Sequence, residues 1–257
     1  IPQYRTPGRK GKMDNAKREI LVKPKSRNVI NEAFRVLRTN TEFTRVNKDG
    51  GNVIAITSFN PGSGKSFITV NLATAVAIKG NKVLVIDGDM RHGSASNYVA
   101  STKVGLSDYL SGETDDLDSL MVTPDDVPTM QVLPVGTVPP NPTALLESPR
   151  FGEMIAKLRD KYDYILIDCP PIEVVADAQI IDQFVDRTIF VVRAGLLERS
   201  MLSELDRLYS EKKYKHIAMI LNGTRNDQGR YGYSHSYKYG YGYGYGYGYN
   251  YGNNKNK

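Results

Sequence analysis

The sequence has a single cysteine and no long apolar run. The lone Cys169 excludes a disulfide within the chain, which fits a reducing compartment. No stretch approaches the roughly 20 apolar residues that a membrane-spanning helix needs, and no signal-peptide pattern opens the chain. Because the first residue is Ile1 rather than methionine, we expect the 257 residues to be a piece of a longer protein.

The sequence also lacks a basic surface spread over its whole length. The net charge is +6, yet residues 1–28 alone hold nine Lys or Arg against two acidic residues, so the remainder is close to neutral. This distribution argues against a nucleic-acid-binding domain, and no nucleic acid is expected as a partner. The basic leader is either a flexible segment close to an anionic membrane surface or a solvated linker without a partner.

A glycine-rich turn stands between an apolar run at residues 53–57 and a helical pattern at residues 65–79. A strand, such a turn and a helix in succession form the context of a phosphate-binding P-loop. Backbone N–H groups of the turn and the positive end of the helix dipole would hold the phosphates of ATP. The residues expected to bind the nucleotide here are Pro61, Gly62, Ser63, Gly64, Lys65, Ser66 and Phe67.

Two side chains of this motif have expected roles. Lys65 reaches the β- and γ-phosphates, and the Ser66 hydroxyl completes the shell of a Mg²⁺ ion. Phe59 takes the place of the first glycine of the general pattern, and Pro61 stiffens the loop. A chance Gly-Lys-Ser at a strand-to-helix junction is therefore the alternative for the motif taken alone.

Two further apolar runs end in carboxylates. Residues 83–86 lead into Asp87 and Asp89, and residues 164–167 lead into Asp168. Unbroken apolar runs are typical of strands buried in a parallel sheet, and ligands bind at the carboxyl ends of such strands. We therefore expect Asp87 and Asp168 to hold Mg²⁺ together with the P-loop serine.

Catalytic roles are expected for Lys65, Asp87 and Asp89. The spacing of the two aspartates does not decide which of them accepts a proton, and a turn whose acids merely cap a helix is the alternative.

The remaining pattern alternates strands with helices. Residues 188–192 and 216–222 are predicted strands, separated by a helix over residues 200–213. Shorter elements are expected at residues 105–110 (helix), 130–134 (strand) and 149–160 (a helix with Ser148 as N-cap). This order predicts an α/β fold with a doubly wound, mostly parallel sheet of the P-loop NTPase type.

Asn222 ends the last predicted strand, where its amide is expected to hydrogen-bond an adenine edge, with Arg225 nearby. A plain turn asparagine is the alternative.

Three charged residues recur at intervals of three on the helical pattern that begins at Asn31: Glu32, Arg35 and Arg38. Glu32 can pair with Arg35 within the helix, or all three can reach a neighbouring subunit. A solvated helix face is the third possibility.

The C-terminal segment has a composition of its own. Ten of the chain's 17 tyrosines lie there, mostly alternating with glycine, and the segment lacks aliphatic residues for a core. We expect a disordered tail that is an adhesive segment, a stacking platform for single-stranded nucleic acid, or a set of phosphate-accepting hydroxyls. The expected phosphoacceptors are Tyr231, Tyr233, Tyr237, Tyr239, Tyr241, Tyr243, Tyr245, Tyr247, Tyr249 and Tyr251.

Taken together, these motifs resemble the cytoplasmic kinase domain of bacterial tyrosine kinases of the exopolysaccharide-export type, the BY-kinases. The resemblance runs from Asn31 to the tail. The motifs that carry it are the P-loop, Asp87-x-Asp89-x-Arg91, Asp168-x-x-Pro171, the turn from Gly136 to Pro142, Glu32-x-x-Arg35-x-x-Arg38 and the tyrosine cluster.

The resemblance implies a protein-tyrosine kinase that uses ATP and Mg²⁺ at the cytoplasmic face of the bacterial plasma membrane. Glu32, Arg35 and Arg38 would build a homo-oligomeric ring in which each tail is phosphorylated by a neighbour. The implied partners are a tyrosine phosphatase and the polysaccharide export machinery, in the control of exopolysaccharide or capsule synthesis. The corresponding layout is a juxtamembrane-like linker at 1–28, a kinase domain at 29–226 and the tyrosine tail at 227–257.

Two other functions are compatible with parts of the sequence. A membrane-associated or partitioning ATPase switch of the same P-loop branch would phosphorylate nothing, but such proteins carry an extra lysine ahead of the glycines, where this chain has Asn60. A binding module would make the tail the functional element and the ATP site its regulator.

Overall fold

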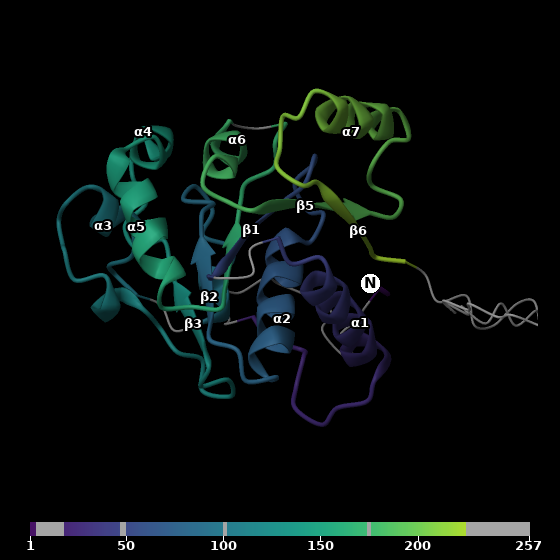
Figure 1. The fold of residues 1–257 in the computed structure, drawn as a ribbon, viewed down its shortest axis with the longest axis horizontal. Helices are drawn as coiled ribbons and strands as arrows, with labels where there is room; N and C mark the ends of the chain where they lie inside the picture. The colour runs from purple at the N-terminus through teal and green to yellow at the C-terminus, as the bar shows by residue number, and fades with distance from the viewer. Residues whose placement is uncertain (4–17, 47–49, 100–101, 174–175, 225–257) are drawn as a thin grey trace, which may run out of the picture. The chain divides into compact units, whose positions relative to one another are not determined.

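The computed structural model describes residues 1–3, 18–46, 50–99, 102–173 and 176–224. Six strands in this part of the chain form one sheet in the order β3-β2-β4-β1-β5-β6, with every neighbouring pair parallel (Figure 1). The strands are β1 (Asn52–Thr57), β2 (Val83–Asp87), β3 (Met130–Leu133), β4 (Tyr164–Asp168), β5 (Arg187–Arg193) and β6 (Ala218–Asn222). The predicted α/β fold with a parallel sheet is confirmed.

Helices accompany the strands in the described ranges. The α-helices are α1 (Val29–Phe43), α2 (Lys65–Ala77), α3 (Leu106–Leu110), α4 (Pro142–Leu146), α5 (Pro149–Arg159), α6 (Asp177–Asp182) and α7 (Ser200–Ser210). Two 3₁₀ helices are η1 (Ser96–Tyr98) and η2 (Asp118–Leu120).

Helices cover both faces of the sheet. Ile54 and Ile56 of β1 belong to one hydrophobic cluster with α1 and α2, whereas Val53 and Ala55 belong to another with α5 and α6. Successive side chains of a strand point to opposite faces, so a strand covered on both sides is apolar throughout. This burial explains the unbroken apolar runs in the sequence.

The short predicted elements are present with small differences. Ser148 is the N-cap residue of α5, but its hydroxyl donates to the Leu145 carbonyl at 2.7 Å instead of capping the helix. The helix expected to reach residue 213 ends at Ser210. The sequence did not predict α6, because six residues are too few for a periodic pattern to emerge.

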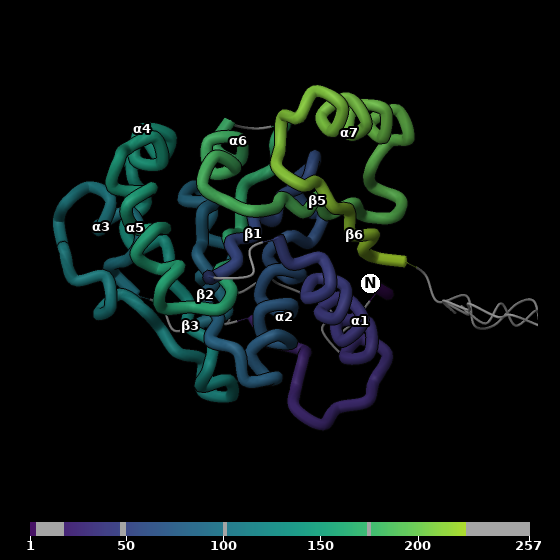
Figure 2. The backbone as a smooth tube through the Cα atoms, viewed as in Figure 1, coloured from purple at the N-terminus to yellow at the C-terminus, as the bar shows by residue number. Residues whose placement is uncertain are grey.

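Part of the basic leader packs on the domain (Figure 2). The backbone N–H groups of Leu21 and Val22 donate to Oδ1 of Asn71 on α2 at 2.9 and 3.0 Å, and the Val22 side chain is buried. Pro2 forms a β-bridge with Thr224, just beyond β6. A flexible linker would make no such contacts. The described part of the leader instead packs on the domain, because Asn71 of α2 accepts hydrogen bonds from its backbone.

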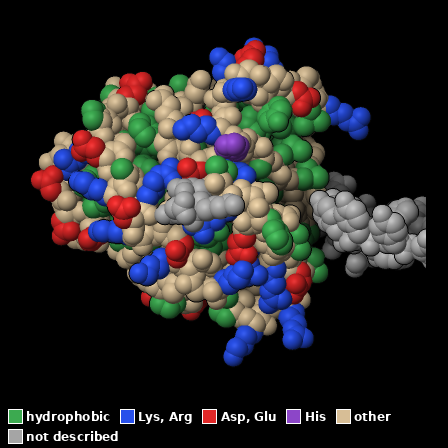
Figure 3. Space-filling model, viewed as in Figure 1, with side chains coloured by type: hydrophobic (Ala, Val, Ile, Leu, Met, Phe, Trp, Pro, Cys, Tyr) green, Lys and Arg blue, Asp and Glu red, His purple; other side chains and the backbone are tan. Residues whose placement is uncertain are grey.

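Charges of both signs are interspersed on the face shown in Figure 3, in keeping with the near-neutral sequence beyond the leader. In the ranges that the structure describes, no helix has the length and apolar character to cross a bilayer.

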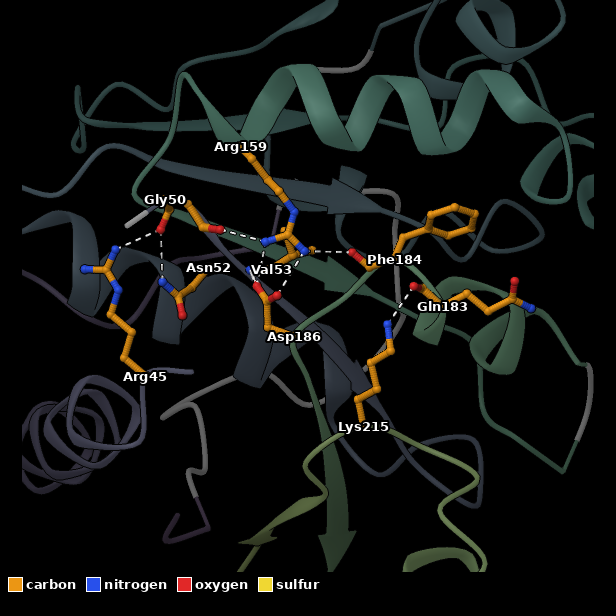
Figure 4. A network of polar contacts seen from close by, with 10 residues as sticks. Arg45, Gly50, Asn52, Val53, Arg159, Gln183, Phe184, Asp186 and Lys215 are labelled. Atoms are coloured by element: carbon orange, nitrogen blue, oxygen red, sulfur yellow. Dashed lines mark hydrogen bonds and ion pairs between the residues drawn. The ribbon is translucent and has the colours of Figure 1, made fainter. Parts of the chain in front are cut away.

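The amino ends of β1 and β5 are joined by a polar network (Figure 4). Arg159, at the end of α5, donates to both carboxylate oxygens of Asp186 at 2.7 and 3.1 Å, and Asp186 also accepts the Val53 N–H at 2.8 Å. The same guanidinium donates to the carbonyls of Gly51 and Phe184. This network fastens α5 to the sheet at the edge opposite the P-loop.

Candidate active site

The P-loop connects the carboxyl end of β1 to α2. Gly62 and Gly64 have φ angles of 75° and 92°, in the left-handed region that favours glycine, and Gly64 is the N-cap residue of α2. A Cβ atom on Gly64 would lie 2.4 Å from the side-chain nitrogen of Asn222. Lys65 and Ser66 form the buried start of the helix, where the first N–H groups have no intrahelical partner. This geometry suits an anion such as a polyphosphate.

Hydrogen bonds within the loop fix its first half. The hydroxyls of Ser58 and Ser63 each donate to the Asn60 carbonyl at 2.8 Å. The Asn60 amide in turn donates to Glu173 at 2.8 Å, which ties the loop to the segment after β4. The position that holds a lysine in partitioning ATPases therefore has a structural contact here.

Residues from the last two strands support the second half of the loop. Arg193 of β5 donates to the Gly62 carbonyl at 2.7 Å, and the Asn222 amide donates to the Ser63 carbonyl at 2.9 Å. Asn222 thus contacts the P-loop in a way that the sequence did not predict, and its contact with an adenine edge stays a prediction. Arg225 lies outside the described residues.

Asp87 and Asp168 stand side by side at the carboxyl ends of β2 and β4, where they are register partners, and both are fully buried. The Asp87 carboxylate accepts two hydrogen bonds on Oδ2, from the N–H and the hydroxyl of Ser96, both at 2.6 Å. Asp168 lies 3.4 Å from the Thr69 hydroxyl.

Burial strongly perturbs this pair. Burial and the neighbouring Asp168 raise the pKa of Asp87 to about 8, although the bonds from Ser96 act in the opposite direction. Burial also raises the pKa of Asp168 to about 6, an effect limited by the charge of Lys65 and a hydrogen bond from Ser66. Both carboxylates therefore keep their protons to a higher pH than a free aspartate, because the surrounding charges and hydrogen bonds do not fully compensate for burial.

The residues present fit a magnesium ion. Oδ1 of Asp87 and Oδ2 of Asp168 are buried oxygens that have no hydrogen-bond partner among the residues that the structure describes. The structure shows no group of three or more His, Cys, Asp or Glu side chains arranged to hold a metal within its described ranges. Mg²⁺ is usually bound by one or two carboxylates together with water and phosphate oxygens, so two carboxylates beside Ser66 match its preference.

Asp89 occupies a different environment from Asp87. Its carboxylate lies 3.2 Å from Nδ1 of His92, whose side chain is exposed, and its carbonyl accepts the N–H groups of His92 and Gly93. Asp89 is thus buried under a turn, but its carboxylate lies next to an exposed histidine side chain.

Phe67 of the predicted nucleotide site and Arg91 of the Asp87-x-Asp89-x-Arg91 motif make contacts that the sequence did not predict. The Phe67 ring packs edge-to-face on Phe34 of α1 with centroids 5.7 Å apart, so only its backbone lies at the helix start. Arg91 points to α6, where its guanidinium lies 3.5 Å from Asp177 and 3.3 Å from the Thr143 hydroxyl. The motif arginine is therefore held at the edge of the site.

The charged triplet lies on α1 with contacts inside the chain. Glu32 pairs with Arg35, which also donates to the Ser26 carbonyl at 2.8 Å. Arg38 donates to the Ala75 carbonyl at 3.3 Å and lies 3.8 Å from Glu42. The tail tyrosines lie outside the described residues.

Sequence reasoning missed Ser96, Thr69 and Arg193. Ser96 follows Asp87 by nine residues and belongs to no motif, and its contact depends on the path of the chain through η1. A buried carboxylate requires donors, which the sequence indicates without locating them.

The fold and the site define a P-loop nucleotide-binding protein, and comparisons with known proteins are more specific. Residues 51–192 match the family described as AAA domain. The chain is 39% identical over 210 residues to tyrosine-protein kinase CpsD of Streptococcus agalactiae, covering 78% of this chain and 89% of that protein. The chain belongs to the AAA domain family and, within it, to the bacterial tyrosine-protein kinases.

Two solved structures are also similar to this chain. The kinase domain of Escherichia coli tyrosine kinase ETK superposes with a TM-score of 0.69 at 34% identity, covering 80% of each chain. The septum site-determining protein MinD of Pyrococcus horikoshii, complexed with Mg-ADP, is similar with a TM-score of 0.56 at 28% identity, covering 66% of this chain and 70% of MinD.

Proposed function

We propose that this chain transfers the γ-phosphoryl group of ATP to tyrosine hydroxyls, with Mg²⁺ as the metal ion. The observation that carries the proposal is the buried, register-paired Asp87 and Asp168 beside the P-loop residues Lys65 and Ser66. Family membership supports the choice of a protein tyrosine as acceptor.

Each residue of the site has a proposed role that follows from its surroundings. The P-loop N–H groups and Lys65 hold the phosphates and stabilise charge that develops on them. The free oxygens of Asp87 and Asp168 and the Ser66 hydroxyl would hold Mg²⁺, directly or through water. Bound Mg²⁺ would neutralise phosphate charge during transfer.

Asp89 is the proton acceptor in this proposal. The tyrosine oxygen forms a bond to the γ-phosphorus as the bond to the ADP oxygen breaks, and the phenolic proton passes to the Asp89 carboxylate. Asp87 is less suited, because one of its oxygens accepts both bonds from Ser96 and the other is proposed to hold the metal. A positioned base is needed since the unperturbed pKa of tyrosine is near 10.

The proposed acceptors are the ten tyrosines from Tyr231 to Tyr251, phosphorylated by a neighbouring copy in a ring built through Glu32, Arg35 and Arg38. The layout that we propose is a linker at 1–28, a kinase domain at 29–226 and a tail at 227–257. Each phosphate adds about −1.5 to −2 charge, so extensive modification would drive crowded tails apart and disperse the ring. A phosphatase would reverse this cycle, in the control of exopolysaccharide or capsule export at the cytoplasmic face of the membrane.

A mixing experiment tests transfer between copies. A Lys65→Met chain with its tail is combined with an active chain that ends at residue 226, and phosphotyrosine on the first chain is detected by mass spectrometry. We expect modification of the Lys65→Met tail, at a rate that rises with the concentration of the active chain. An unmodified tail, beside a wild-type chain that does modify itself, would contradict transfer in trans.

A nucleotide-driven switch without kinase activity is the second candidate, favoured by the likeness to MinD. The residue at position 60 argues against this candidate. The lysine that marks that branch is replaced by Asn60, whose amide donates to Glu173. Nucleotide hydrolysis without any phosphotyrosine would favour this candidate.

A further inference from the structure

The 3₁₀ helix η1 contacts both the leader and Asp87, whose carboxylate is proposed to hold Mg²⁺. Ser96, its first residue, donates from its N–H and its hydroxyl to Oδ2 of Asp87 at 2.6 Å each. Its hydroxyl oxygen also accepts the Val135 N–H at 3.0 Å, which fixes the direction of the hydroxyl. Ser96 therefore provides two hydrogen bonds to Oδ2, whereas Oδ1 has no partner in the described part of the chain.

We propose that Ser96 is a positioning residue that orients Asp87 toward Mg²⁺, and that the leader holds Ser96 in place through η1. The inference rests on the proposed function, in which Asp87 holds the metal. A carboxylate with one oxygen engaged by two donors cannot rotate freely, so its other oxygen is held in one orientation. Partners of this kind around metal ligands commonly change metal affinity by about 10–100-fold when removed.

The leader contacts the same short helix. The Arg18 backbone N–H donates to the Asn97 carbonyl at 2.8 Å, and the Arg18 guanidinium lies 6.0 Å from the centre of the Tyr98 ring. Tyr98 is buried, so its ring fixes η1 to the domain core while Arg18 holds it from outside. A shift of the leader would therefore move the residue that carries the two donors to Asp87.

The test of Ser96 uses affinity for a fluorescent ADP analogue, measured on the full chain with Mg²⁺ and with EDTA. We expect Ser96→Ala to reduce the Mg²⁺-dependent gain in affinity about tenfold and to leave the EDTA value unchanged. Ser96→Thr keeps the hydroxyl and should retain most of the gain. Ser119→Ala is the matched control. Ser119 also lies on a 3₁₀ helix, η2, and its N–H also donates to an aspartate, Asp116, at 3.2 Å. Both residues are far in the sequence from those of the site.

Two results would overturn the role of Ser96: an unchanged gain in Ser96→Ala, or an equal loss with and without Mg²⁺. If circular dichroism shows that Ser96→Ala does not fold, Ser96→Cys gives the same comparison, since a thiol is only a weak donor. No phosphotyrosine is measured, so failure of the kinase proposal and failure of this inference are separate outcomes.

A separate substitution tests the role of the leader. Arg18→Ala should reduce the Mg²⁺-dependent gain about 2–5-fold, the range that corresponds to one exposed cation–π contact. Lys23→Ala is the control, because Lys23 is a leader cation whose charged partner is the exposed Glu19. Equal gains in Arg18→Ala and Lys23→Ala would overturn the coupling between leader and site.

Discussion

Asp87 of β2 and Asp168 of β4 are register partners on neighbouring parallel strands, and neither side chain is exposed to solvent. Two adjacent buried carboxylates repel each other unless protons or a cation compensate their charge. The sheet thus places an unfavourable pair beside a phosphate-binding loop, and the expected compensation is a bound Mg²⁺ with its nucleotide.

The first prediction separates the two aspartates of the Asp-x-Asp motif. Asp87→Asn should lose most of the Mg²⁺-dependent nucleotide affinity, because an amide is a poor ligand for Mg²⁺. Asp89→Asn should bind Mg-nucleotide within about threefold of wild type yet lower the rate of tyrosine phosphorylation roughly 10²–10⁴-fold, the usual contribution of a positioned base. Titration calorimetry and a phosphotyrosine assay measure the two effects. Loss of metal-dependent binding in Asp89→Asn alone would reverse the assignment.

The second prediction concerns the pH dependence of stability without ligand. The pKa of Asp87 is raised from 3.8 to about 8 in the folded chain, so its contribution to stability is complete below pH 4 and is lost as the pH rises toward 8. The melting temperature of the wild type should fall more steeply between pH 5 and pH 8 than that of Asp87→Asn. Parallel curves for the two proteins, followed by circular dichroism, would argue against a buried titrating Asp87.

The third prediction concerns the loop glycine. Gly64→Ala should abolish detectable nucleotide binding, because the left-handed φ strains alanine and its Cβ would lie 2.4 Å from the Asn222 amide. Gly80→Ala is the matched control, with a φ of 100° and no atom within 4 Å of the added Cβ. It should cost only about 1–2 kcal/mol of stability and leave binding intact. Nucleotide titration distinguishes them, and normal affinity in Gly64→Ala would show that the loop tolerates a different path.

The fourth prediction concerns the network at the opposite edge of the sheet (Figure 4). Asp186→Ala should lower the free energy of unfolding by about 2–3 kcal/mol, because the Arg159 guanidinium loses its carboxylate partner and the Val53 N–H loses its acceptor. Asp118→Ala removes an ion pair to Lys161 in which Asp118 is 69% exposed, compared with 18% for Asp186. That control should cost less than about 1 kcal/mol. Urea unfolding measures both, and equal losses would refute a special role for the network.

Much of the fold and part of the site could be predicted from the sequence because they depend on local patterns. The runs that end in Asp87 and Asp168 are apolar throughout since both faces of their strands are covered, and parallel strands bring their carboxyl ends together. The glycines of the loop are required by backbone conformation at Gly62 and Gly64.

The supporting contacts could not be predicted in the same way. Ser96, Arg193 and the docking of the leader on Asn71 join residues far apart in the sequence, and nothing in their immediate neighbours marks them. The packing of the Phe67 ring on α1 is a further contact that the motif does not indicate, and the part of Phe67 in nucleotide binding stays a prediction. Which residues surround a site depends on how helices and loops pack, and spacing along the chain does not encode that.

The most direct test of the account is mass spectrometry of the wild-type chain and of Lys65→Met after incubation with ATP and Mg²⁺ at concentrations that favour self-association. The account predicts phosphate on several tyrosines between Tyr231 and Tyr251 in the wild type and none in Lys65→Met. A wild-type chain that binds or hydrolyses the nucleotide while every one of these tyrosines stays unmodified would contradict it.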